Sequence, residues 1–247
     1  MKLLVLAAGK GTRLKPYTDK TNKCMIHIAN KPLLYHNLLQ CKQACLNLDE
    51  IVIVVGYLKE QIIQYFGNEF MGVPIIYVHQ ENLDGIAGAV ALAKPFLDDQ
   101  PFILVLGDMI LVKPHLKEMI NKFNEMSPDG ICGVVTNKSV EEMQDNYTIQ
   151  FDKHNRIELV VDKPNKPFND FMGTGYFIFS PSTLKYVQKT PICPLSKQRG
   201  ICEWIMLCIN NNLNFYFSIV GEDAININNV NMLNQIKKKF EERSSCV

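Results

Sequence analysis

The residues with the clearest chemical potential lie in the first turn of the chain. An apolar run of strand length, Leu3–Ala8, ends in a Gly-x-Gly corner that carries Lys10 and Arg13. Small residues in such a corner let a ligand approach the main chain, and the N–H groups of the loop can point into a concavity that suits phosphate. Two cations beside those amides indicate a polyphosphate with a metal ion. The same pattern also fits an ordinary tight turn at a strand end.

Two common phosphate-binding loops are excluded by spacing. A Walker loop requires a glycine five positions before Gly9, and none stands there. The dinucleotide-binding fingerprint requires a third glycine where this chain has Leu14, and Pro16 then disfavours a helix beginning at that point. The loop instead continues as a long polar segment that ends on another cation, Lys23.

Six sequence blocks in a fixed order resemble the sugar-1-phosphate nucleotidyltransferases, or nucleotide-sugar pyrophosphorylases. The first block is the loop with Lys23 and Asn30–Leu33. The others extend the resemblance over about residues 3–233, at Gln80–Ala89, Leu106–Asp108, Val161–Pro164, Thr174–Tyr176 and Ile227–Asn229. The resemblance implies an enzyme that joins a nucleoside triphosphate and a sugar-1-phosphate, with Mg²⁺ as cofactor, and releases pyrophosphate.

Length and composition agree with such an enzyme. The chain has 247 residues, enough for a core and a cleft, and its net charge of +1 gives no reason to expect nucleic acid or a membrane as partner. The first apolar run is too short for a secretory leader. Eight cysteines without a Cys-x-x-Cys pair predict reduced thiols. We therefore expect a cytoplasmic protein, and a homo-oligomer is left open.

Strand-like and helix-like runs alternate along the first half of the chain. Buried strands are predicted at 51–55, 74–78 and 102–106. Helices are predicted at 32–46, 58–66, 86–97 and 114–123. This alternation predicts an α/β fold with a doubly wound, mostly parallel, Rossmann-like sheet and helices on both faces. Ligands bind beyond the carboxyl ends of such strands, so one crevice should be lined by Ala7, Val55, Gln80 and Gly107.

From about residue 131 the predicted strands are joined by polar turns. We expect strands at 147–151, 156–161, 173–179 and 213–220, and helices at 181–188, 201–210 and 230–240. No linker separates the two parts, so residues 1–247 are expected to form a single nucleotidyltransferase domain. Its nucleotide-binding half covers about residues 1–130, and a smaller sugar-phosphate-binding lobe with a closing helix covers about 131–247. Nothing after Phe240 resembles the β-helix that many relatives append.

The resemblance assigns the catalytic work to three cations. Arg13 would hold the leaving β- and γ-phosphates, Lys23 would bridge the α-phosphate and pyrophosphate, and Lys163 would hold the phosphate of the incoming sugar. Because two polyanions must be brought together, positioning and charge neutralisation supply most of the catalysis. Each of the three residues could alternatively be a solvated loop cation.

The nucleotide is expected to bind along the loop and in a base pocket beyond it. The loop residues concerned are Leu6, Ala7, Ala8, Gly9, Lys10, Gly11 and Thr12. Gln80 and Gly85 match the family positions that meet the base, and a glutamine amide can satisfy both the donor and the acceptor of a uracil or thymine imide. This favours UTP or dTTP over purines. We interpret Glu81 and Asp84 as solvated loop charges.

The metal is expected at Asp108 and Asn228. Asp108 follows a predicted strand at the crevice, and its carboxylate suits Mg²⁺, which prefers oxygen ligands. It could alternatively cap the following element. Asn228 matches the second metal ligand of some relatives, although Asn226 and Asn229 are close enough for the assignment to shift.

The sugar is left open between glucose and N-acetylglucosamine. The positions that match sugar-binding residues of the family are Asp162, Thr174 and Gly175. Asn22 replaces a proline of the family, which we expect to loosen the loop. Thr148 replaces a glycine, and Gly173 stands where enzymes that use N-acetylhexosamine tend to carry asparagine.

Three classes of function compete. The first is a Mg²⁺-dependent enzyme that makes a nucleotide-sugar from a pyrimidine triphosphate. The second is a catalytically silent homologue that binds a nucleotide-sugar and regulates a partner, but such a protein would be expected to lose the cations or the metal aspartate. The third is a guanylyl- or cytidylyltransferase of the same fold, including one with an acceptor such as phosphocholine, and the predicted sugar-binding blocks argue against that acceptor.

Overall fold

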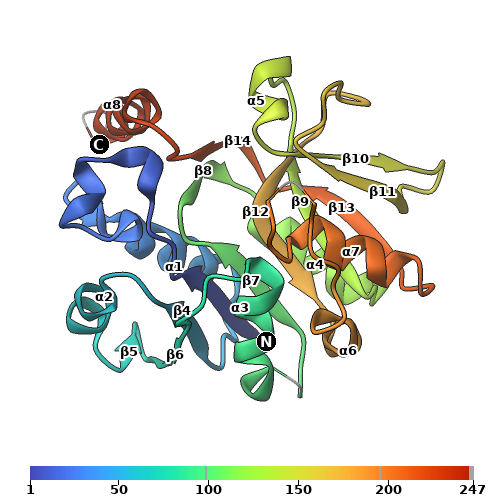
Figure 1. Cartoon of the computed structure of the whole chain (residues 1–247), viewed down its shortest axis with the longest axis horizontal. Coiled ribbons are helices and arrows are strands. Elements are labelled where there is room, and N and C mark those ends of the chain that lie inside the picture. Colours follow the sequence, from blue (N-terminus) through green and yellow to red (C-terminus); the bar gives the residue numbers. More distant parts are fainter. Residues whose placement is uncertain (98, 195, 245–247) are drawn as a thin grey trace.

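A computed structural model describes residues 1–97, 99–194 and 196–244 (Figure 1). The centre of its main sheet consists of parallel strands in the order β7 (Phe102–Leu106), β1 (Lys2–Ala7), β4 (Ile51–Val55) and β6 (Val73–His79). These strands consist mainly of apolar residues, many of them β-branched, and β4 is buried throughout, as a strand covered on both faces should be. The predicted α/β fold with a parallel core is confirmed.

Beyond β7 the same sheet continues into the second half of the chain with a change of direction. β12 (Met172–Phe179) runs antiparallel to β7 and is followed by β10 (Tyr147–Phe151) and β11 (Ile157–Asp162). β9 (Gly130–Val135) also pairs antiparallel with β12, and β13 (Phe215–Ile219) lies parallel to β9. At the opposite edge the short β5 (Glu69–Phe70) pairs with β6. The two halves therefore share one continuous sheet, as Figure 1 shows.

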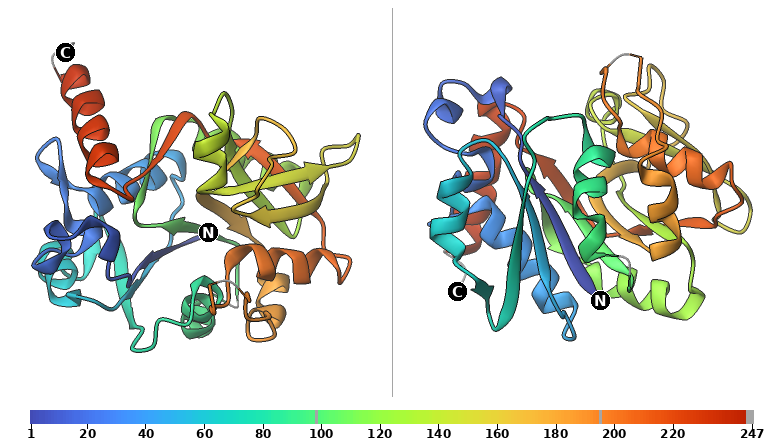
Figure 2. Two further views of the ribbon diagram at one scale, coloured as in Figure 1. Left: turned by 45° about the horizontal axis from the view of Figure 1, so that its top comes forward. Right: turned by 60° about the horizontal axis from the view of Figure 1, so that its bottom comes forward.

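Helices cover both faces of this sheet, as predicted. One face packs against α1 (Leu33–Ala44), α2 (Lys59–Phe66) and α4 (Leu116–Met126). The other packs against α3 (Ile86–Ala93), α6 (Leu184–Val187) and α7 (Ile201–Ile209). Trp204 of α7 is fully buried and stacks on Phe179, with ring centroids 4.4 Å apart. Figure 2 shows helices on the two sides of the twisted sheet.

The sequence did not reveal two strands that carry the candidate site. β8 (Met109–Pro114) and β14 (Gly221–Asn226) form a separate antiparallel pair, so the predicted helix at 114–123 begins later, as α4. β9 was missed as well. The pairing of β8 with β14 joins residues more than a hundred positions apart, which local patterns do not reveal. The predicted helix at 86–97 is α-helical only to Ala93 and then continues as a 3-10 turn that contains Pro95.

The last helix described, α8 (Val230–Ser244), returns to the start of the chain. Its Leu233 and Ile236 are buried in a third apolar cluster with Leu14 and Ile28, the latter in β2 (His27–Ile28). β2 pairs with β3 (Lys31–Pro32). Figures 1 and 2 show α8 beside the segment that follows β1. The C-terminal helix thus packs against the N-terminal loop region.

The described cysteines are all free thiols, in agreement with the reduced state that we expected, and Cys246 lies outside the described residues. Within the part of the chain that the model describes, none of the helices has the length and apolar character needed to cross a membrane.

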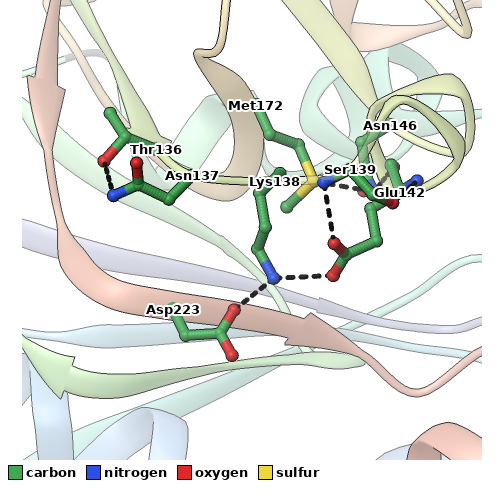
Figure 3. A network of polar contacts seen from close by, with 8 residues as sticks. All are labelled: Thr136, Asn137, Lys138, Ser139, Glu142, Asn146, Met172 and Asp223. Carbon is green, nitrogen blue, oxygen red and sulfur yellow. Dashed lines mark hydrogen bonds and ion pairs between the residues drawn. The ribbon is translucent and has the colours of Figure 1, made fainter.

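A buried cation ties the segment that follows β9 to β14 (Figure 3). Lys138 has only 9% of its side chain exposed and forms ion pairs with Glu142 of α5 (Val140–Gln144) at 2.7 Å and with Asp223 of β14 at 2.5 Å. Burial raises the pKa of Glu142, but the Lys138 ammonium opposes this effect and outweighs it. The pKa of Glu142 therefore lies below its usual range. Ser139 completes a capping box with Glu142 at the start of α5.

We expect Lys138→Met to lower the free energy of unfolding by about 2 kcal/mol at pH 7, because it leaves two carboxylates without their cation. Glu142 has a lowered pKa, so its stabilising contribution is present above the pKa of a free glutamate, about 4.3, and is lost as the pH falls through the folded value. The difference between wild type and variant should therefore shrink below about pH 4.3.

Urea unfolding between pH 3 and pH 8 measures both effects. Lys113→Met is the matched control, because its ion pair with Glu222 is more than half exposed on both sides, and we expect a loss below about 1 kcal/mol. Equal losses in the two variants would contradict the role given to Lys138.

Candidate active site

A cavity of about 470 Å³ lies where β1 and β6 end. Its lining includes the residues predicted from the sequence for the nucleotide, Arg13, Lys23, and both predicted metal ligands. The full lining is Leu6, Ala7, Ala8, Gly9, Lys10, Gly11, Thr12, Arg13, Leu14, Lys23, Cys24, Gln80, Leu83, Gly85, Ile86, Ala89, Leu106, Asp108, Gln198 and Asn228. Ala7 and Gln80 therefore line one crevice as expected, whereas Val55 and Gly107 are not among the lining residues.

The loop after β1 is shaped by its second glycine. Gly11 has φ +61°, a left-handed conformation that glycine adopts without strain, and a Cβ there would lie 3.0 Å from the Cβ of Lys23. The Thr18 hydroxyl donates to the Gly11 carbonyl oxygen at 2.9 Å. Around Gly9, in contrast, a Cβ would meet nothing within 4 Å. The loop is thus packed against its own continuation at Gly11 and open to the cavity at Gly9.

Asn22 fixes the loop that we expected it to loosen. Its side chain is fully buried, and its Nδ2 donates to the carbonyl oxygens of Ala7 at 3.3 Å and Tyr57 at 2.6 Å. Its Oδ1 accepts from the Cys24 N–H at 2.8 Å, and its own N–H donates to Gln61 Oε1. The expectation was wrong because a short polar side chain can hold the loop through hydrogen bonds that proline lacks.

The pair of β8 and β14 brings the predicted metal ligands together. Asp108 stands in the turn between β7 and β8, and Asn228 follows β14. The first residue of β8, Met109, faces Asn226 across the pair, and the Ile227 N–H donates to the Asp108 carbonyl oxygen at 3.0 Å. Asn226 ends β14, and Asn229 instead accepts from the Met232 N–H as the cap of α8. Asn228 alone of the three asparagines lines the cavity.

Lys23 lies between these two oxygen ligands. Its Nζ donates to Asp108 Oδ2 at 2.6 Å and to Asn228 Oδ1 at 3.2 Å, and only 9% of its side chain is exposed. Burial raises the pKa of Asp108, but the attraction and hydrogen bond of Lys23 outweigh it and hold the pKa below its usual range. Arg13 contributes in the same direction. Asp108 is therefore held as a carboxylate beside Lys23, which belongs to the loop after β1.

The residues present fit a divalent magnesium ion. A carboxylate oxygen and an amide oxygen already converge on one positive group, the Lys23 ammonium. Mg²⁺ takes oxygen ligands, and one or two from the protein are sufficient when substrate phosphates and water supply the others. No cluster of three or more His, Cys, Asp or Glu residues occurs within the described ranges, so a metal cage made by protein side chains is not found there.

Gln80 and Gly85 also line the cavity. Gln80 is 4% exposed, and its Nε2 donates to Asp84 Oδ1 at 3.1 Å. Asp84 also pairs with the Arg199 guanidinium at 3.5 Å, and 46% of its side chain is exposed, so it is only in part the solvated charge that we expected. Glu81, with 80% of its side chain exposed, is the solvated charge that we expected.

Lys163 and Asp162 line a second cavity, of about 690 Å³, between β11 and α7. Burial and the nearby Glu203 raise the pKa of Asp162, and Lys163 opposes them. Lys163 has φ +47°, unusual for a residue other than glycine, and its N–H donates to the Asn146 carbonyl oxygen at 2.7 Å. The structure thus brings Arg13, Lys23 and Asp108 together and places Lys163 at a separate cavity.

Thr174 and Gly175 line neither cavity. The Thr174 hydroxyl is buried and donates to the Gly133 carbonyl oxygen at 2.9 Å. A Cβ at Gly175 would lie 2.8 Å from the Cβ of Leu106. Both residues therefore have a packing role in β12, against β9 and β7, whatever else they contact.

Comparison with known proteins identifies the family of the chain. The family model described as nucleotidyl transferase matches residues 2–224. The chain belongs to the nucleotidyl transferase family. As a sugar-1-phosphate nucleotidyltransferase, it is the enzyme type that the sequence motifs predicted.

Relatives share about a third of the aligned residues. The chain is 35% identical to the UTP–glucose-1-phosphate uridylyltransferase of Haloferax volcanii, over 74% of this chain and 73% of the relative. It is 30% identical to the bifunctional protein GlmU of Methanocaldococcus jannaschii, over 98% of this chain and 58% of that protein. It is also 30% identical to a glucose-1-phosphate thymidylyltransferase of Streptomyces griseus, over 74% of this chain and 50% of that protein. The matches thus span 58% and 50% of the length of the last two relatives.

Solved structures show the same fold. A UDP-glucose pyrophosphorylase complexed with UDP-glucose superposes with a TM-score of 0.85 over 98% of both chains, at 19% identity. The fold of this nucleotidyltransferase therefore agrees with that structure along almost its whole length.

Sequence reasoning missed the contribution of the segment before α7. Gln198 lines the cavity of about 470 Å³ and donates through Nε2 to the Leu83 carbonyl oxygen at 2.9 Å. The neighbouring Arg199 N–H donates to the Asp84 carbonyl oxygen. Gln198 and Arg199 lie more than a hundred residues after Leu83 and Asp84 in the sequence. Only the sheet that joins the two halves of the chain brings these residues together.

We expect Asn22→Ala to lower the free energy of unfolding by about 2–3 kcal/mol, because it leaves two carbonyl oxygens and one N–H without their partner. Asn22→Pro should not restore stability, although the φ of −58° suits proline, because proline also removes the N–H that bonds Gln61. Urea denaturation measures both variants, with Asn124→Ala on the exposed side of α4 as control. A proline variant as stable as wild type would show that these bonds contribute little.

Proposed function

We propose that this nucleotidyltransferase condenses a pyrimidine nucleoside triphosphate, UTP or dTTP, with a hexose-1-phosphate and releases pyrophosphate. The observation that carries the proposal is the convergence of Arg13, Lys23 and Asp108 on one cavity that Gln80 also lines. A triphosphate bound with its base at Gln80 would place its phosphates at the glycine loop. Glucose-1-phosphate and N-acetylglucosamine-1-phosphate are the proposed acceptors.

The cations of the loop neutralise the phosphates. Arg13 and Lys10 lie on the same loop as the Gly9 and Gly11 amides and would hold the β- and γ-phosphates as pyrophosphate leaves. Lys23 is already held beside Asp108, where it would contact the α-phosphate. Mg²⁺ bound by Asp108 and Asn228 would supply further positive charge for the triphosphate.

The acceptor needs orientation more than activation. A sugar phosphate is already an anionic nucleophile, so a general base is not required, and Lys163 would fix its phosphate against the α-phosphorus. Asp162, which lines the same cavity as Lys163, is proposed to bind sugar hydroxyls beside it. A Cβ at Gly173 would lie 2.1 Å from the ring of Tyr147, so an asparagine there would displace that ring. This favours glucose-1-phosphate as the first acceptor to test.

The base preference is supported by the amide of Gln80, which can pair with the imide edge of uracil or thymine. The names of the relatives at 30–35% identity include uridylyl-, thymidylyl- and guanylyltransferases, so they do not choose the base. A guanylyltransferase or cytidylyltransferase of the same fold is the alternative, which a panel of triphosphates separates directly.

We expect pyrophosphate release only when UTP or dTTP, a hexose-1-phosphate and Mg²⁺ are all present. Arg13→Gln should reduce kcat by about 10²–10³, the typical loss of one preorganised transition-state donor. Lys15→Gln is the control, because Lys15 is 63% exposed and pairs with Asp19 outside the cavity. A coupled pyrophosphate assay with five triphosphates and several sugar-1-phosphates provides the measurement. Absence of release from every pair, or full activity of Asp108→Ala, would refute the proposal.

We expect Lys163→Ala to act on the acceptor alone. The KM for the sugar-1-phosphate should rise at least about tenfold, while the KM for the triphosphate changes less than about twofold, because the lost cation contacts only the acceptor phosphate. Lys166→Ala, an exposed lysine three residues later, is the control. Initial rates over a grid of both substrates separate the two constants. A rise in the triphosphate KM instead would place Lys163 with the donor.

A further inference from the structure

Gln80, which lines the candidate cavity, belongs to a series of polar contacts that reaches the second half of the molecule. Gln80 Nε2 donates to Asp84 Oδ1 at 3.1 Å, and Asp84 Oδ2 lies 3.5 Å from Nη1 of Arg199. Gln80 is almost completely buried, so its hydrogen-bonding partners determine which way its amide faces. The sequence analysis interpreted Asp84 as a solvated loop charge and did not consider Arg199.

The main chain holds Asp84 in place from both sides. The Arg199 N–H donates to the Asp84 carbonyl oxygen at 2.9 Å, and the Arg199 carbonyl oxygen accepts from the Ala87 N–H at 3.0 Å. A Cβ at Gly88 would lie 1.8 Å from Asp84 Oδ1, so the carboxylate occupies the space that a side chain would fill. At Gly85 a Cβ would lie 2.4 Å from the Arg199 carbonyl oxygen. The position of the carboxylate is thus built into this loop.

The chemistry of the carboxylate decides the orientation of the amide. Ionised aspartate only accepts hydrogen bonds, so the part of Gln80 that faces it must be the NH₂ group. Gln80 Oε1 and the second N–H of the amide are then left to meet a ligand in the cavity. In the reversed orientation, Oε1 would face Asp84 Oδ1, and two acceptors without a proton between them would lie in contact.

We propose that Asp84, held by Arg199, is a positioning residue that fixes the Gln80 amide and thereby selects the class of base. An outward Oε1 accepts from a ring N–H that stands beside a carbonyl group, as at N3 of uracil and thymine or N1 of guanine. Cytosine and adenine present an unprotonated ring nitrogen beside an amino group, which would require the reversed amide. The inference rests on the proposed function in one respect, that Gln80 meets the base.

Binding of UTP and CTP in the presence of Mg²⁺ tests this inference by titration calorimetry, without a sugar-1-phosphate. In Asp84→Asn the Arg199 guanidinium retains the amide oxygen, so the new NH₂ group faces Gln80 and allows its reversal. We expect the ratio of the Kd for CTP to the Kd for UTP to fall at least about tenfold. The reason is that the reversed amide exchanges its donor and acceptor, which allows a hydrogen bond to cytosine and removes one to uracil. Asp84→Ala should lower the ratio as well, and Arg199→Gln should lower it less.

Glu81→Gln is the matched control, because it removes a neighbouring carboxylate whose side chain is 80% exposed, and we expect an unchanged ratio. A ratio within twofold of wild type in both Asp84 variants would overturn the inference. Equal weakening of UTP and CTP would also overturn it, since that is the result of a merely structural role. If the Asp84 variants do not fold, as judged by thermal unfolding, an unchanged ratio in Arg199→Gln decides against it.

The measurement requires no turnover. Absence of pyrophosphate release from the substrate panel would therefore refute the proposed reaction, whereas an unchanged binding ratio would refute only the role of Asp84. The two failures are separate results.

Discussion

The candidate site depends on one ammonium group held between two oxygens at the meeting point of distant segments. Lys23 comes from the loop after β1, Asp108 from the turn after β7, and Asn228 from the segment after β14. A cation buried to this degree requires partners, because burial without them is costly. The fold must therefore bring these segments together, and it does so through the short pair of β8 and β14 and through the packing of α8 beneath the loop.

The parallel core and the phosphate loop were predictable from the sequence because their signals are local. The runs at 51–55 and 102–106 match β4 and β7 without adjustment, and each is a continuous apolar segment of strand length. The cavity-lining role of Gly9, Arg13 and Lys23 also followed from spacing in one segment. Local spacing and composition were sufficient in these cases because the same residues fix the main-chain geometry and carry the charge.

The remainder depended on contacts between distant residues. β8 and β14 contain polar residues and pair with each other across more than a hundred positions, so neither could be recognised alone. Asn22 illustrates the same limit on a smaller scale. Its departure from a family proline indicated a loose loop, but its partners at Ala7 and Tyr57 are visible only once the strands are assembled. The ion pair of Asp84 was missed for the same reason, since Arg199 comes from the other half.

These long-range contacts have a consequence for how the two halves relate. Gln198 and Asn228, which line the cavity, and Arg199, which bonds the main chain of Asp84, all come from the second half of the chain. The first half supplies the loop and most of the cations, but it does not hold Asp84 or place Asn228 beside Lys23 by itself. The site is therefore a property of the continuous sheet that passes from β7 to β12. The segment before α7 lines the second cavity at Cys193 and Ser196, and the same segment contacts Leu83 and Asp84 near Gln80, so it connects the two cavities.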